Sequence, residues 1–150
     1  MPIRLRTPMP EFAGAAARLN GDAPREALAG RPALVHFWSL GCSCCSEVLS
    51  RVNAWRESYG ERCGLQVVGV HVPRSEAEKD IEAVRAAILR YAVRHPVLID
   101  NDAAVAAAFG NEALPSFYLF DETAALRHYQ AGDRGLDLLE RRIRKLAGLG

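Results

Sequence analysis

Hydrophobic positions along the chain form short continuous runs and longer stretches with a helical period. Short apolar runs rich in β-branched residues and bounded by Pro or Gly favour buried strands. They predict strands at 32–39, 65–72, 96–99 and 116–120. A further strand at 125–130 would follow 116–120 through a tight turn, which indicates a hairpin.

Apolar residues spaced three and four positions apart predict helices between these strands. The predicted helices are 24–28, 45–59, 76–93, 103–109 and 137–146, with glycines ending the first at Gly30, the second at Gly60 and the fourth at Gly110. Helices that alternate with strands, followed by a hairpin and a last helix, are typical of an α/β fold. We therefore expect a central mixed sheet with helices on both faces.

Length and charge narrow the choice of function. A chain of 150 residues predicts one domain, 1–150. The formal net charge of +1 indicates neither a nucleic-acid partner nor an anionic membrane surface. The sequence has no apolar run long enough to span a bilayer, and its start lacks the apolar core of a signal peptide. These features predict a cytoplasmic protein.

Candidate chemistry is concentrated in the segment WSLGCSCC, which holds three of the four cysteines. Cys42 falls where the first buried strand gives way to a helix, and Cys45 follows three residues later. Helical i,i+3 neighbours lie about 5–6 Å apart at Cβ, close to disulfide geometry. Near a helix N-terminus Cys42 would be the exposed, attacking thiolate, and Cys45, on the apolar stripe, the sheltered resolving thiol.

Cys44 is predicted to be a bystander. On a helical wheel it points about 200° away from Cys42 and lies half exposed, near Arg51, so the two could not bridge without backbone movement. A zinc or copper module is the alternative, with these cysteines and His36 or His71 as ligands. Structural zinc sites usually pair two clusters, and Cys63 stands alone, so we expect no metal and no cofactor.

Several segments in order resemble the thioredoxin superfamily. They are LRTPMPEFAG, LVHFWSLGCSCC, VVGVHVPRSE, PVLIDND, ALPSFYLFD and LRHYQAG, and together they cover nearly the whole chain. Within the superfamily the chain resembles the TlpA/ResA-type thiol–disulfide oxidoreductases, in particular the YkuV-like branch. The resemblance implies a four- or five-stranded sheet flanked by helices, with a helical insertion near 74–93.

The same resemblance implies roles for individual residues. Cys42 would attack a substrate disulfide and Cys45 would resolve the mixed disulfide. Pro115 would follow a cis peptide bond and face the cysteine pair, and Leu114 would offer its backbone to a substrate strand. Trp38 would also contact the substrate. Expected partners are protein or small-molecule disulfides and a recycling reductase, and the expected state is a monomer.

Two positions depart from the superfamily pattern. Gly41 stands where many relatives carry Trp, which would leave the nucleophile more open. His36 stands where thioredoxin has a buried Asp, so it is either a proton acceptor for the resolving thiol or a satisfied core histidine. His71, His95 and His128 are expected to be structural or surface residues.

The function that these features predict is thiol–disulfide exchange, with the protein acting as a reductant. An alternative enzymatic function is that of a peroxide-reducing relative. It fits less well, because such enzymes place the reactive cysteine in a T-x-x-C context and only Ser39 stands three residues before Cys42.

Overall fold

The computed structural model describes the whole chain except residues 23–27, 29 and 150, and it describes the backbone but not the side chain of Cys45. The helix predicted at 24–28 therefore lies almost entirely outside the described residues. No helix in the described part of the chain is both long and apolar enough to cross a bilayer.

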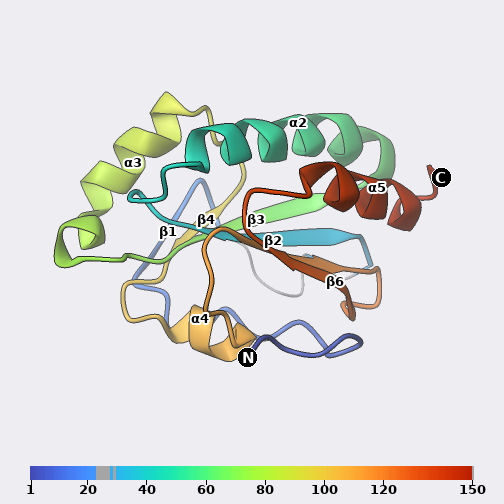
Figure 1. The fold of residues 1–150 in the computed structure, drawn as a ribbon, viewed down its shortest axis with the longest axis horizontal. Coiled ribbons are helices and arrows are strands. Elements are labelled where there is room, and N and C mark those ends of the chain that lie inside the picture. Colours follow the sequence, from blue (N-terminus) through green and yellow to red (C-terminus); the bar gives the residue numbers. More distant parts are fainter. Residues whose placement is uncertain (23–27, 29, 150) are drawn as a thin grey trace.

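A mixed sheet forms the centre of the molecule (Figure 1), which confirms the predicted α/β class. Parallel pairing joins β3 to β2 and to β4, and antiparallel pairing joins the other neighbours. The spatial order is β1-β4-β3-β2-β5-β6, with bounds β1 Ala17–Leu19, β2 Ala33–Trp38, β3 Gln66–His71, β4 Val97–Ile99, β5 Ser116–Phe120 and β6 Leu126–Ala131. The edge strand β1 was not predicted, and it makes the sheet six-stranded.

Helices cover both faces of this sheet (Figure 1). α2, α3 and α5 lie over one face, and α4 lies over the other together with the N-terminal segment. Their bounds are α2 Cys45–Cys63, α3 Ile81–Arg90, α4 Ala104–Phe109 and α5 Leu136–Leu146, with a short 3₁₀ helix η1 at Glu76–Lys79.

Strand β2 lies in the middle of the sheet, and all six of its residues are buried. Its side chains alternate between the two faces, as the period of a strand requires. Val35 and Phe37 pack in the cluster that includes α4, whereas Leu34 packs with α2 and α5. Trp38 points to the same side as Leu34 and packs with residues of α3.

Two predicted helix boundaries were wrong. α2 continues through Gly60 and ends at Gly64, whose positive φ of 74° suits a left-handed C-cap. The helix predicted at 76–93 is divided into η1 and α3. Asp80 interrupts it with an extended backbone, and its side chain accepts a hydrogen bond of 3.0 Å from the amide of Glu82, which caps α3.

Asp100 links β4 to α4 through a fully buried carboxylate. Its two oxygens accept hydrogen bonds from the amides of Val105 at 2.9 Å and Ala106 at 2.8 Å. A charged acceptor out of contact with water is costly unless it is hydrogen-bonded, and here it also satisfies two amides that the short helix leaves free. This carboxylate therefore holds α4 against the sheet.

We expect D100A to lower the free energy of unfolding by about 2–3 kcal/mol, because two buried amides lose a charged acceptor. D100N keeps one acceptor oxygen and should lose about half as much. Urea denaturation measures the difference. The exposed neighbour Asp102 supplies the control, since D102A should change stability by less than about 0.5 kcal/mol. Equal losses for D100A and D102A would contradict this account.

Candidate active site

The register of the sheet brings four chain segments to one edge. Phe37, near the end of β2, lies opposite Ser116 at the start of β5, and Ser116 lies opposite Ala131 at the end of β6. On the other side Trp38 lies opposite His71 at the end of β3. The cysteine segment, the bond before Pro115, the loop after β3 and the loop before α5 therefore all emerge at this edge.

A tight turn holds Cys42 at the end of β2. The amide of Cys42 donates to the carbonyl of Ser39 at 3.2 Å, which closes the turn. The amide of Leu40 donates to Nε2 of the buried His71 at 3.1 Å. An imidazole that accepts at Nε2 is neutral and carries its proton on Nδ1. A neutral His71 thus ties the turn to β3.

Cys42 itself is buried, with 9% of its surface exposed, so the prediction of an exposed attacking thiol was wrong for this conformation. The thiol packs in a cluster with Trp38, Leu49 and residues of α3. α2 begins at Cys45 with Cys44 as its N-cap, so the start of the predicted helix was correct, but the placing of Cys42 at its first turn was wrong. Cys42 therefore lies in the preceding turn, outside the first turn of the helix.

Gly41 does not open the site as predicted. A Cβ atom at Gly41 would come within 2.5 Å of a carboxylate oxygen of Glu78, so the η1 side chain occupies the space beside this glycine. The other Glu78 oxygen accepts a hydrogen bond of 3.1 Å from the amide of Arg74. The helical insertion thus covers the turn where an aromatic side chain is missing.

Cys44 contacts Cys42, contrary to the prediction. Their Sγ atoms are 3.2 Å apart. The helical-wheel angle does not apply, because both residues precede the helix and the backbone between them forms a turn. Cys44 is half-buried, as predicted. Burial, followed by the hydrogen bond and charge of Cys42 and the charge of Asp133, raises the pKa of Cys44 to about 11.

Cys45 is placed by its backbone as the first residue of α2, and its side chain lies outside the described residues. The predicted pairing of Cys42 with Cys45 therefore stays a prediction. Cys42, Cys44 and Cys63 are free thiols. Among the described side chains, no group of three or more His, Cys, Asp or Glu residues is placed to hold a metal ion.

His36 forms a buried pair with His95, a partner that sequence reasoning did not find. The two Nε2 atoms are 2.8 Å apart, and His36 is completely buried. Nδ1 of His95 lies 3.1 Å from Nη1 of Arg56, on α2. Gly69 leaves room for the pair, since a Cβ atom there would lie 3.0 Å from Nε2 of His36. His95 is thus a core residue.

The arginine fixes the direction of this chain of hydrogen bonds. A guanidinium only donates, so Nδ1 of His95 accepts and its Nε2 carries the proton. His36 then accepts at Nε2 and carries its own proton on Nδ1, which has no hydrogen-bond partner among the described residues. Burial lowers the pKa of His36 to about 3, so this imidazole is neutral at pH 7.

The predicted substrate-binding residues lie at the same edge of the sheet. The peptide bond between Leu114 and Pro115 is cis, as the resemblance implied. The carbonyl of Leu114 accepts a hydrogen bond of 3.3 Å from Nη2 of Arg74. Trp38 is 1% exposed and packs in the same cluster as Cys42. In this conformation it presents almost no surface, and its contact with substrate stays a prediction.

Known proteins resemble the chain along almost its full length. The AhpC/TSA family matches residues 5–129. The thiol-disulfide oxidoreductase YkuV of Bacillus subtilis is 42% identical over 96% of this chain and 97% of its own. The thioredoxin-like protein SkfH of the same species is 28% identical, covering 77% of each chain.

A solved structure of a thioredoxin-like protein in its oxidised form superimposes with a TM-score of 0.90 at 41% identity, over 97% of this chain and 98% of that one. DsbF of Mycobacterium tuberculosis superimposes with a TM-score of 0.73 at 27% identity, over 89% of this chain and 94% of that one. These structures confirm the thioredoxin-like fold.

The buried histidines predict a loss of stability in mild acid. Burial lowers the pKa of His71 to about 4 and that of His36 to about 3, against about 6.5 in the unfolded chain. Between these values the unfolded state binds more protons, so stability falls as the pH drops below 6.5. We expect a loss of about 1–2 kcal/mol for each buried histidine between pH 7 and pH 5.

Urea denaturation at the two pH values measures this loss, and H71Q should lose less between them than the wild type. H128Q removes a half-buried histidine of β6 and should follow the wild type. Asp121 and Glu140 do not interfere, because hydrogen bonds to each carboxylate, from Thr123 to Asp121 and from Tyr59 to Glu140, outweigh burial and lower its pKa. A wild-type stability that is the same at both pH values would contradict the prediction.

Proposed function

The chain belongs to the AhpC/TSA family and is a thiol–disulfide oxidoreductase, and on that premise we propose that Cys42 is its attacking thiol and Cys45 its resolving thiol. The observation that carries the proposal is the position of Cys42. Its turn is closed on Ser39 and tied to His71 at the sheet edge where the Leu114–Pro115 bond also lies. Cys45 follows at the start of α2.

The exchange proceeds in two displacements. The Cys42 thiolate attacks one sulfur of a substrate disulfide, a bond forms between protein and substrate, and the other substrate sulfur leaves as a thiolate. Cys45 then attacks the Cys42 sulfur, which releases the second substrate thiolate and leaves a Cys42–Cys45 disulfide. A separate reductase would return the pair to the dithiol.

We place the substrate strand against the backbone of Leu114. Extended peptides bind by adding main-chain hydrogen bonds to an open backbone segment. The carbonyl of Leu114 is held by Arg74, whose side chain is exposed, so an incoming strand would displace one charged hydrogen bond. The buried Cys42 sulfur also requires the turn or the η1 segment to open before attack.

His36 would serve the resolving step through its Nδ1. In the hydrogen-bond chain with His95 and Arg56, this atom carries a proton, so it would stabilise a thiolate as a donor. To accept a proton there, as first predicted, the His36–His95 hydrogen bond would have to reverse and Arg56 to withdraw. His36 can therefore accept a proton at Nδ1 only after these hydrogen bonds have rearranged.

The direction we propose is reduction of protein or small-molecule disulfides, by a monomer in the cytoplasm. What supports exchange with disulfide substrates is the likeness to the thiol-disulfide oxidoreductase YkuV over almost the full length of both chains.

Insulin reduction with dithiothreitol tests the cysteine assignment. C42S should fall to the uncatalysed rate, because the proposal assigns the first attack to Cys42, and the neighbouring Cys44 thiol, whose pKa burial raises to about 11, is mostly protonated at neutral pH. C45S should lose most of its turnover while still forming a mixed disulfide. Cys63 ends α2, far along the helix from the cysteine segment, and C63S should keep the wild-type rate. Wild-type turnover by C42S would refute the assignment of the nucleophile.

A further inference from the structure

The unexpected contact at the site is between the thiols of Cys42 and Cys44. Their sulfur atoms are 3.2 Å apart, and a disulfide bond is about 2.05 Å long, so the gap to a bond is only about 1 Å. Cys44 is not an isolated surface thiol. It packs against the cluster that contains Cys42 and also against the cluster between α2 and α5.

Local backbone geometry makes this contact possible. Cys44 is the N-cap of α2, with φ −93° and ψ 0°, and Cys42 lies in the turn before it. The backbone at Ser43 and Cys44 forms a turn before the helix begins, and the two side chains come into contact. A bridge between these residues would therefore need rotation of the two side chains and no dissolution of α2.

We propose that Cys44 is a second resolving thiol, which can trap Cys42 in a Cys42–Cys44 disulfide in place of the Cys42–Cys45 disulfide. The inference rests on the proposed role of Cys42 as nucleophile. After Cys42 has formed a mixed disulfide, the Cys44 thiolate attacks the Cys42 sulfur. The protein–substrate bond breaks, the substrate leaves as a thiolate, and the proton of Cys44 passes to solvent. The protein is oxidised by two electrons and the substrate disulfide is reduced to two thiols.

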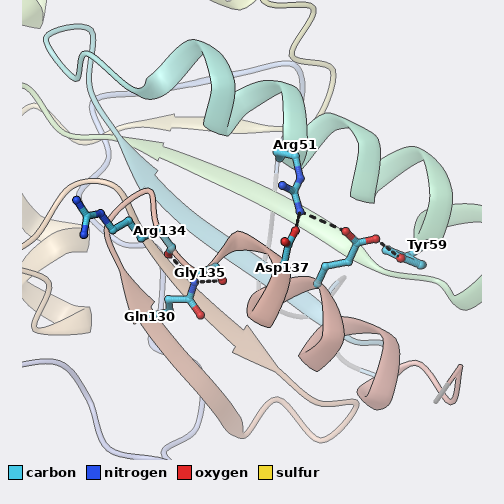
Figure 2. Close-up of polar contacts among 7 residues, drawn as sticks. Arg51, Tyr59, Gln130, Arg134, Gly135 and Asp137 are labelled. Carbon is cyan, nitrogen blue, oxygen red and sulfur yellow. Dashed lines mark hydrogen bonds and ion pairs between the residues drawn. The ribbon is translucent and has the colours of Figure 1, made fainter.

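The surroundings of Cys44 determine how fast it attacks the mixed disulfide on Cys42. Burial is the largest cause of the raised pKa of Cys44, the hydrogen bond and charge of Cys42 and the charge of Asp133 add to it, and a backbone hydrogen bond at Cys44 acts against them. The loop that carries Asp133 is anchored, because Nε2 of Gln130 donates to the carbonyls of Arg134 at 3.3 Å and Gly135 at 2.6 Å. Figure 2 shows this anchor beside the start of α5.

Helix α5, which follows this loop, is bound to α2. Nη2 of Arg51 donates to Asp137 at 2.9 Å and to Glu140 at 3.4 Å, and Glu140 also accepts from the hydroxyl of Tyr59 at 2.5 Å (Figure 2). Asp133 lies in the loop between these two sets of contacts, and its charge adds to the raised pKa of Cys44. At neutral pH few Cys44 thiols are ionised, so the second route is slow and accelerates as the pH rises.

Oxidised glutathione, added to two matched variants, tests the inference. C45S/C63S keeps Cys42 and Cys44, whereas C44S/C45S/C63S keeps Cys42 alone. Intact-mass measurement after acid quenching distinguishes a glutathione adduct from an internal disulfide. We expect C45S/C63S to pass from the adduct to an internal disulfide, about tenfold faster for each pH unit between 7 and 9. The triple variant should stop at the adduct.

The outcomes separate this inference from the proposed function. A stable adduct on C45S/C63S at pH 9 would overturn the role of Cys44 and leave Cys42 as nucleophile. No adduct on the triple variant would overturn the assignment of Cys42, and this inference with it. D133N, added to C45S/C63S, should speed internal disulfide formation a few-fold, because a charge that disfavours the thiolate is gone. Variants with alanine in place of serine repeat the comparison if a serine variant fails to fold.

Discussion

The pairing of β2 with β3 on one side and β5 on the other is the constraint on which the rest of the site depends. It is a parallel ladder next to an antiparallel one, so the end of β2 meets the end of β3 and the start of β5. The cysteine turn, His71 and the bond before Pro115 all take their positions from this pairing. A one-residue slip of β2 would exchange its two faces, turning Phe37 and Trp38 to the wrong clusters.

Because this strand is buried, the histidines near it are neutral, and each of their hydrogen bonds has a fixed donor and a fixed acceptor. His71 can hold the cysteine turn only while its Nε2 is unprotonated. His36 and His95 share one hydrogen bond, and Arg56 sets its direction from the surface of α2. The site thus obtains ordered donors and acceptors in the core without a buried charge, which would be far more costly.

The sequence pattern predicted those elements whose formation depends on neighbouring residues, such as buried strands and capped helix ends. The apolar run around Phe37 and the glycine stop at Gly110 were correct, because burial on both faces and a left-handed cap leave direct marks in sequence. β1 was missed because its three residues carry no strand pattern and are held by pairing with β4. The break at Asp80 was missed because the residues before it are helix-forming Glu, Ala and Lys, with no Gly or Pro to indicate an interruption.

Contacts between distant segments were beyond sequence reasoning. His95 lies 59 residues from His36, and only the pairing of the strands brings the two rings together. Glu78 and Arg74 reach the cysteine edge from an insertion whose path no pattern reveals. The prediction for Cys44 failed for a different reason. It assumed that helical geometry begins at Cys42, whereas the helix begins three residues later.

The central claim is that every redox event of this protein passes through the Cys42 sulfur. Differential alkylation of oxidised wild-type protein tests it most directly. Free thiols are blocked, disulfides are then reduced and labelled with a second reagent, and fragmentation of the peptide reads the label on each cysteine. The account predicts the second label on Cys42 in every oxidised molecule, paired with label on Cys45 or on Cys44. An oxidised pool in which Cys44 and Cys45 carry the second label while Cys42 is blocked as a free thiol would contradict it.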